Sequence, residues 1–269
     1  MRRSAGFFIL TLLSVVLGAF VGSVCAQQQD EYRRLKSVQF IGNKALTAAQ
    51  LQSHLKFAKS GKRVVPEMVE YDLNTNLKDF LKEKGFLRHE FSWKLIPLPG
   101  KDVALQVQLT EGLQYRLTGL AIHGFTVFSK EAISSQFHLK PGGIANYIEI
   151  EKAVRRIKGM YFDLGLMDVE VIQDLEVDPK NQGVVASFDI WEGIQYRIAY
   201  VGIVGCGDQA EEDRLRARIE LHPGDTFSAG KLDAVTASLK KRGVSENTVE
   251  ILDVKKGLLG IVFWLRPKG

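Results

Sequence analysis

The sequence predicts an α+β protein built of three tandem two-layer modules, each a three-stranded sheet covered by two helices. Three observations predict it: a repeated heptapeptide, glycines that recur in phase with it, and an apolar periodicity that changes in the same order in each copy. The heptapeptide EGLQYRL at 111–117 returns as EGIQYRI at 192–198, an offset of 81 residues. The expected modules are residues 32–112, 113–193 and 194–269, and the third is degenerate because it lacks a terminal Glu-Gly pair.

Nine glycines keep the same period, with offsets of 78 to 82 residues between successive copies. Glycine is the residue that best tolerates a positive φ or a close backbone approach, so we expect special backbone geometry at each position. The nine are Gly42, Gly124 and Gly205 after the first strand, Gly61, Gly142 and Gly224 after the first helix, and Gly85, Gly165 and Gly243 at the end of the second helix.

The first copy shows the elements in order. Residues 35–41 alternate apolar and polar side chains, as a strand does. Thr47 and Gln50 have the spacing of a capping box that starts the first helix, and Pro66 stands where the first turn of the second helix is expected. Gly85 then ends the second helix, because glycine takes the left-handed conformation that is common after a helix C-terminus.

The other elements follow from the same periodicities. Apolar stripes predict a second helix over 69–81, 150–164 and 232–239, shorter in the third copy. Alternation predicts strands at 87–95 and 103–109 in the first copy, 115–122, 167–174 and 184–190 in the second, and 196–204, 248–254 and 258–265 in the third. Since no Ser/Gly-rich or Pro-rich spacer separates the copies, we expect limited hinge motion between modules.

The first 26 residues have the pattern of a secretory signal peptide. Two arginines precede an apolar run at 7–21, and the small residues of 24–26 supply a cleavage site. We expect export and cleavage after Ala26. An uncleaved anchor helix is one alternative, and a lipoprotein with Cys25 at its N-terminus is another, which the bulky Val24 disfavours.

Composition and motifs carry no enzyme signature. The formal net charge of +5 is small for 269 residues, and Lys and Arg alternate with Asp and Glu, so no nucleic acid partner is expected. The glycine run at 202–207 has the reverse of the dinucleotide-binding spacing. The five histidines form no pair at metal-ligand spacing, and Cys206 is expected to be a small apolar filler. We therefore expect no cofactor, no metal and no catalysis.

The three tryptophans, Trp93, Trp191 and Trp264, lie in strand-like runs. Large aromatic side chains in such runs mostly bury their area against other apolar groups. We expect them to pack in a core or between modules and not to stack on a ligand.

These landmarks resemble the polypeptide-transport-associated (POTRA) family. The resemblance rests on the element order, on FIGN at 40–43, on LKEKGF at 81–86 and on the Glu-Gly pairs at 111–112 and 192–193. It implies a non-enzymatic periplasmic arm of the outer-membrane barrel-assembly and protein-translocation family, associated with the membrane only through its partner. The implied partners are extended polypeptides and a separately encoded outer-membrane β-barrel; a free-standing envelope or cell-division adaptor is the alternative.

The resemblance also implies where a partner would bind. It places the strand after the second helix, 167–174 in the second copy, at the edge of its sheet. An extended polypeptide adds to such an edge through main-chain hydrogen bonds, which is β-augmentation. Carboxylates at 168, 170 and 174 are typical of an edge protected against self-pairing, and protection alone is the alternative interpretation. The candidate binding residues are Asp168, Val169, Glu170, Val171, Ile172 and Gln173.

Overall fold

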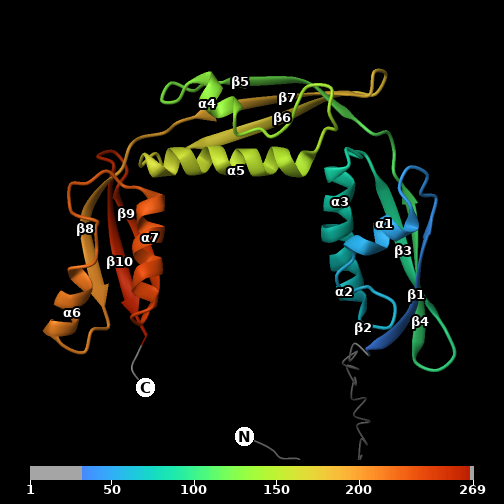
Figure 1. The fold of residues 1–269 in the computed structure, drawn as a ribbon, viewed down its shortest axis with the longest axis horizontal. Coiled ribbons are helices and arrows are strands. Elements are labelled where there is room, and N and C mark those ends of the chain that lie inside the picture. Colours follow the sequence, from blue (N-terminus) through green and yellow to red (C-terminus); the bar gives the residue numbers. More distant parts are fainter. Residues whose placement is uncertain (1–31, 267–269) are drawn as a thin grey trace, which may run out of the picture.

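Residues 32–266 are described by a computed structural model, so the predicted leader at 1–26 lies outside the described residues. They form three modules, each with its own sheet and its own hydrophobic core (Figure 1). The order strand–helix–helix–strand–strand appears three times. The predicted fold class is therefore confirmed.

Module 1 differs from the prediction in having four strands. The additional β2 (Arg63–Val64) pairs antiparallel with the start of β1, and the second helix contains a π-helical segment, η1, that begins at the fully buried Asp72. The Asp72 carboxylate accepts hydrogen bonds from three consecutive backbone N–H groups, at 56–58. The elements are β1 (Arg33–Ile41), α1 (Ala48–His54), β2, α2 (Pro66–Tyr71), η1 (Asp72–Leu77), α3 (Lys78–Glu83), β3 (Glu90–Pro97) and β4 (Asp102–Thr110).

Module 2 has the predicted three-stranded sheet and the longest helix, which starts at the side-chain cap of Asn146. Its last strand buries alternate residues, as the apolar–polar alternation requires. The elements are β5 (Arg116–His123), α4 (Lys130–Ser134), α5 (Tyr147–Asp163), β6 (Glu170–Asp178) and β7 (Gly183–Trp191).

Module 3 contains the first helix that the repeat predicts before Gly224, although no apolar stripe marks it. This helix, α6, has a single fully buried residue, Leu215, and is started by the side chain of Asp208, which accepts a hydrogen bond from the N–H of Glu211. The second helix, α7, is shorter than its counterparts, as predicted. The elements are β8 (Arg197–Val204), α6 (Gln209–Arg216), α7 (Ala229–Lys240), β9 (Val244–Asp253) and β10 (Leu258–Leu265).

The three sheets share one topology. The last strand of each module is central, parallel to the first strand and antiparallel to the middle one. The first strand of each module also carries a one-residue register shift at the same place, opposite the start of the central strand. The unpaired residues at these shifts are Lys36, Thr118 and Ala199. The three modules therefore share a β-bulge at the same position of the first strand.

The predicted glycine geometry is confirmed at all nine positions, each of which has a positive φ. Gly42, Gly124 and Gly205 also lie in equivalent surroundings. A Cβ added to each would meet the carbonyl oxygen of the last residue or the residue before last of the central strand, namely Leu109, Ile190 and Leu265.

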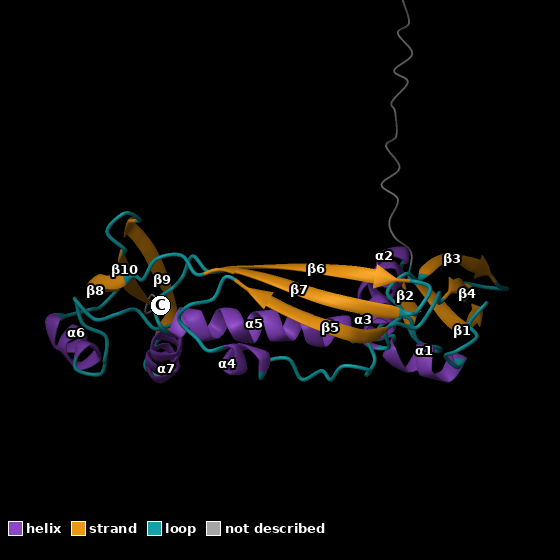
Figure 2. Cartoon of the chain, turned by 90° about the horizontal axis from the view of Figure 1, so that it is seen from above, coloured by secondary structure: helices purple, strands orange, loops and turns teal. Residues whose placement is uncertain are grey.

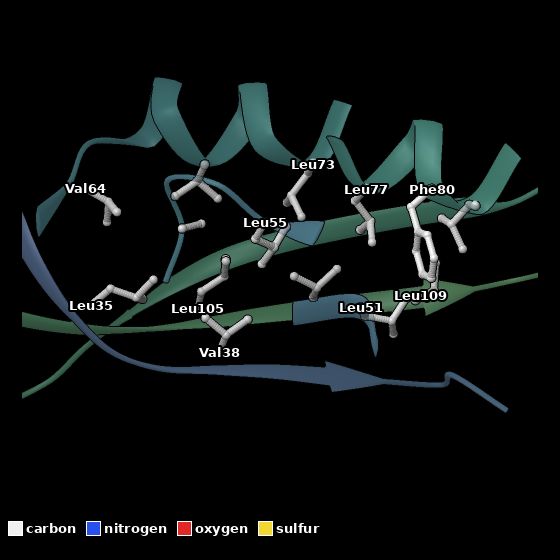
Figure 3. Packing of buried hydrophobic residues seen from close by; sticks show 14 of the residues in the cluster. Leu35, Val38, Leu51, Leu55, Val64, Leu73, Leu77, Phe80, Leu105 and Leu109 are labelled. Carbon is white, nitrogen blue, oxygen red and sulfur yellow. The ribbon is translucent and has the colours of Figure 1, made fainter. Parts of the chain in front are cut away.

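Each core lies between one face of the sheet and the two helices. In module 1, Val69, Leu73, Leu77 and Leu81 of the second helix are buried against the sheet (Figure 3). The opposite face of the module 2 sheet is bare, because α4 and α5 cover one side only (Figure 2). Every module is thus a two-layer unit that presents its sheet outward.

The modules form an arch in which module 2 is the span and modules 1 and 3 are the legs (Figure 1). The ends of α5 contact α3 on one side and α7 on the other. The second helices therefore line the inside of the arch, while the sheets form its outside.

We expect the substitution Gly124→Ala to destabilise module 2 by about 2–4 kcal/mol, because φ is +79° and the new Cβ would collide with the Ile190 carbonyl. Gly159→Ala in the interior of α5 is the matched control. Beyond the local backbone of the helix, no described atom lies within 4 Å of its Cβ position, so it should stabilise by about 0.5–1 kcal/mol. Urea denaturation of both variants measures the effects, and equal stabilities would contradict the prediction.

Candidate functional site

The repeated heptapeptide forms the two joints between modules. At the first joint the side-chain amide of Gln114 donates to the Lys84 carbonyl at the end of α3, and the N–H of Tyr115 donates to the Gly85 carbonyl. At the second joint Gln195 donates to the Leu164 carbonyl and Tyr196 to the Gly165 carbonyl. The four distances lie between 2.8 and 3.0 Å, so the two joints are built alike.

Gly85 and Gly165 are required at these joints for two reasons. Each ends its helix in a Schellman motif, in which the N–H of the following residue donates to Leu81 or Tyr161. Each also lacks the Cβ that would lie within 3 Å of the carbonyl oxygen of Tyr115 or Tyr196. The backbone of one module therefore lies directly against the helix end of the module before it.

The tyrosine of the heptapeptide is the buried anchor of each joint. Tyr115 and Tyr196 are 1% and 0% exposed. The hydroxyl of Tyr196 donates to the Asp168 carboxylate at 2.8 Å, and the pKa of Tyr196 is raised by burial and by that carboxylate. The arginine after each tyrosine, Arg116 or Arg197, donates to the carbonyl of the glycine that follows the first helix.

The glutamate that opens the heptapeptide organises the loop after the first strand of its own module. Glu111 is 5% exposed, and its carboxylate accepts from the N–H groups of residues 44, 45 and 46 at 2.7–3.0 Å. Glu192 accepts from the N–H groups of Thr126 and Val127, from the Thr126 hydroxyl and from the Tyr161 hydroxyl. Burial raises the pKa of Glu192, but these hydrogen bonds outweigh it and lower the pKa below its ordinary value.

Module 3 holds the same loop in another way. Proline occupies position 267, where the other modules have the glutamate, and lies outside the described residues. Within the described residues, the N–H of Gly207 instead donates to the Glu211 carboxylate on α6. The module that lacks the terminal Glu-Gly pair in its sequence thus uses a glutamate from its first helix, and not from its last strand, to bind the loop after the first strand.

The topology leaves the middle strand of each module at a sheet edge. Among residues 32–266, β6 pairs only with β7, over nine consecutive residue pairs without a register shift. The edge strand β9 has two register shifts, and β3 ends in Pro97. β6 is therefore the longest regular free edge of the described chain, and the strand that the resemblance placed at an edge is at one.

The six candidate residues divide between that edge and the joint. Asp168 and Val169 precede β6: Asp168 accepts the Tyr196 hydroxyl bond of the second joint, and Val169 is buried in the module 2 core. Glu170 and Ile172 point to the bare face of the sheet, whereas Val171 and Gln173 lie on the helix side. The amide of Gln173 donates to the Tyr147 hydroxyl on α5 at 2.7 Å.

The outer faces of the sheets differ chemically although the cores are alike. The outer face of β6 is acidic around the half-exposed Ile172, whereas the outer face of module 3 has exposed apolar side chains on β8 and β10 beside Glu246 and Glu250 of β9. The acidic residues are Glu170, Asp174, Glu176 and Asp178, and the exposed apolar ones of module 3 are Tyr200, Val204 and Trp264.

The prediction that all three tryptophans pack inside is wrong for two of them. Trp93 packs against the module 1 core, but Trp191 and Trp264 lie on outer sheet faces with 67% and 39% exposure. Alternation places residues on one of two faces, and these two tryptophans share the face of the exposed residues of their strands.

Between residues 32 and 266, no three His, Cys, Asp or Glu side chains are grouped to hold a metal ion. Burial and the nearby Glu211 and Glu212 carboxylates raise the pKa of the Cys206 thiol, which packs against the module 3 core. No helix in this part of the chain is long and apolar enough to cross a bilayer.

Comparison with known proteins identifies the module. A family model described as POTRA, surface antigen variable number repeat, matches residues 115–193, which contain every helix and strand of module 2. Module 2 matches the POTRA family model, and the chain has the fold of tandem POTRA modules. The crystal structure of POTRA3-5 of BamA from Haemophilus influenzae superposes with a TM-score of 0.73 at 16% identity, covering 90% of this chain and 99% of that one. Three consecutive POTRA modules therefore share this fold.

The curated relatives that match the POTRA repeats are outer membrane protein assembly factors. A putative factor from Treponema pallidum is 25% identical over 76% of this chain and 25% of its own length. BamA from Neorickettsia risticii is 24% identical over 82% of this chain and 29% of its own length. The chain thus spans about a quarter to a third of these relatives.

We expect Glu192→Gln to destabilise module 2 by about 1–3 kcal/mol at neutral pH, because an amide cannot accept all the hydrogen bonds that converge on the carboxylate. The folded-state pKa of Glu192 is lowered, so its contribution is present above the ordinary value of 4.5 and is lost as the pH falls through the folded-state pKa. The difference in the free energy of unfolding between wild type and Glu192→Gln should therefore shrink as the pH is lowered, as measured by urea denaturation at several pH values. Glu170→Gln, at an exposed carboxylate, should have the same free energy of unfolding as the wild type at every pH measured.

We expect Tyr196→Ala to cost about 3–5 kcal/mol and to loosen the second joint, because it empties a fully buried site. Tyr196→Phe removes only the bond to Asp168 and should cost about 1 kcal/mol. Spin-label distances between modules 2 and 3 should broaden in the alanine variant alone. An unchanged distribution there would show that this tyrosine does not fix the joint.

Proposed function

We propose that this chain is a periplasmic scaffold that binds extended segments of outer-membrane proteins during their assembly or secretion, with an outer-membrane β-barrel as its partner. The observation that carries the proposal is the free edge of β6, regular over nine residue pairs. The relatives that are outer membrane protein assembly factors support the class of client.

Binding would proceed by β-augmentation along β6. The main-chain N–H and C=O groups that face away from β7 pair with those of an added strand, so the interaction tolerates many client sequences. Outward carboxylates at 170, 174, 176 and 178 would disfavour pairing of β6 with a second copy of itself, because like charges would lie opposite each other. An edge of this kind accepts a client while it resists self-association.

The joints support this role by fixing the direction of the edge. Each joint combines a buried tyrosine with hydrogen bonds to a helix end, so the arch presents β6 in one orientation. A rigid edge loses little conformational entropy when a client binds.

A photo-cross-linking residue at position 172 tests the proposal directly, because Ile172 is 53% exposed on β6. Position 246, on the irregular edge strand β9 of module 3, is the matched control. We expect an unfolded outer-membrane protein segment to cross-link about tenfold more at 172 than at 246, since only β6 offers an uninterrupted ladder. Equal cross-linking at both positions would overturn the assignment of β6.

The partner is tested separately by purifying the chain from envelope extract. Recovery of an outer-membrane barrel protein supports the assembly scaffold. Recovery of division or cell-wall proteins without a barrel would favour the envelope adaptor instead.

A further inference from the structure

The first 35 described residues of module 1 are strongly basic. Residues 32–66 contain eight Lys and Arg and no Asp or Glu, so the alternation of charges predicted for the whole sequence fails here. Strands β1 and β2 begin or end at the tip of the leg, far from the joint with module 2, and the β3–β4 turn lies at the same tip (Figure 1). The fold thus brings several of these cations to the tip of module 1, away from the β6 edge that we propose binds clients.

Two of these cations are held directly opposite each other. Arg34 of β1 and Arg63 of β2 are register partners in an antiparallel pair, so their side chains leave the same face close together. The N–H of Arg34 donates to the Lys101 carbonyl, which brings the β3–β4 turn beside them. Like charges placed opposite one another destabilise a strand pair unless an anion lies between them.

The one described carboxylate that lines this place is already paired with another cation. Asp102 lies next to Arg34 on β4, but its carboxylate pairs with Lys36 at 3.2 Å. Neither Arg34 nor Arg63 has an ion pair with another residue of 32–266. The two guanidinium groups, Tyr32, Lys101 and Asp102 line a hollow of about 420 Å³.

We propose that this hollow binds the phosphate of an anionic phospholipid headgroup and so docks the tip of module 1 on a membrane surface. Guanidinium groups bind phosphate oxygens in a bidentate manner, and two opposed groups can hold one phosphate from both sides. The hollow is many times the roughly 30 Å³ share of one water molecule, which suits a headgroup better than a small ion.

The extent of the basic surface favours a lipid bilayer as the source of the phosphate. Further cations lie at 33 and 36 on β1 and at 59 and 62 on the loop hydrogen-bonded to it, so the basic residues extend beyond the hollow, as an extended anionic surface requires. Tyr32 is 58% exposed at the rim, where an amphipathic ring suits the headgroup region.

Binding to vesicles tests the proposal, with the chain from Gln27 onward, which contains every described residue. The probes are vesicles of phosphatidylcholine alone and of phosphatidylcholine mixed with phosphatidylglycerol. We expect binding to the mixed vesicles only, weakened about thirtyfold in R34A/R63A. The control R155A/K180A removes two exposed cations from module 2 and should bind as the wild type does.

The conservative variant R34K/R63K keeps the charge and removes the bidentate geometry, so we expect affinity between those of the wild type and R34A/R63A. Equal losses of vesicle affinity in R34A/R63A and R155A/K180A would show that binding depends only on net charge and would overturn the site. Full vesicle binding by R34K/R63K would have the same meaning. Release from the vesicles by inorganic phosphate at millimolar concentration would assign the hollow to free phosphate. Binding to an oligonucleotide without binding to the mixed vesicles would assign the surface to nucleic acid and equally overturn the proposal.

Discussion

The hydrogen-bonded joint between each helix end and the following heptapeptide is the constraint on which the arch depends. The carbonyl of the glycine after the helix accepts a hydrogen bond from the N–H of a buried tyrosine. The side-chain amide of the glutamine before that tyrosine donates to the carbonyl of the residue before the glycine. These groups are satisfied only when the two modules are in contact, and a buried unpaired polar group is costly. Because both joints use equivalent atoms, module 2 is joined to module 1 in the same manner as module 3 is joined to module 2.

The shared joints and cores leave the outer surfaces free to differ. An inward position must be apolar and of the right size, whereas an outward one has no such requirement. Module 2 accordingly carries carboxylates along β6, module 3 carries exposed apolar side chains on β8 and β10, and module 1 carries opposed arginines at its tip. One repeated fold thus supports three surfaces of different chemistry, and the proposed binding activities lie on those surfaces.

Local signals predicted many elements well and failed where they were weak or long-range. The Thr47 capping box and Pro66 located the helices of module 1, and the repeat glycines located turns with positive φ. Helix α6 was expected from the repeat before Gly224, but its bounds were not predicted because it has no apolar stripe; the Asp208 cap was a readable signal. The two-residue β2 was missed because its pairing depends on β1, and the outward tryptophans because periodicity does not say which of two faces is inward.

The sequence by itself determined the repeat, the order of elements and the residues of the joint, because these depend on local periodicity and on backbone conformations that only glycine readily adopts. Tertiary structure alone decided that β6 ends as a regular free edge and that Arg34, Arg63 and Lys101 meet at one tip. Strand pairing joins residues far apart in the chain through main-chain groups that every residue carries. Such contacts leave no pattern in the sequence of either strand.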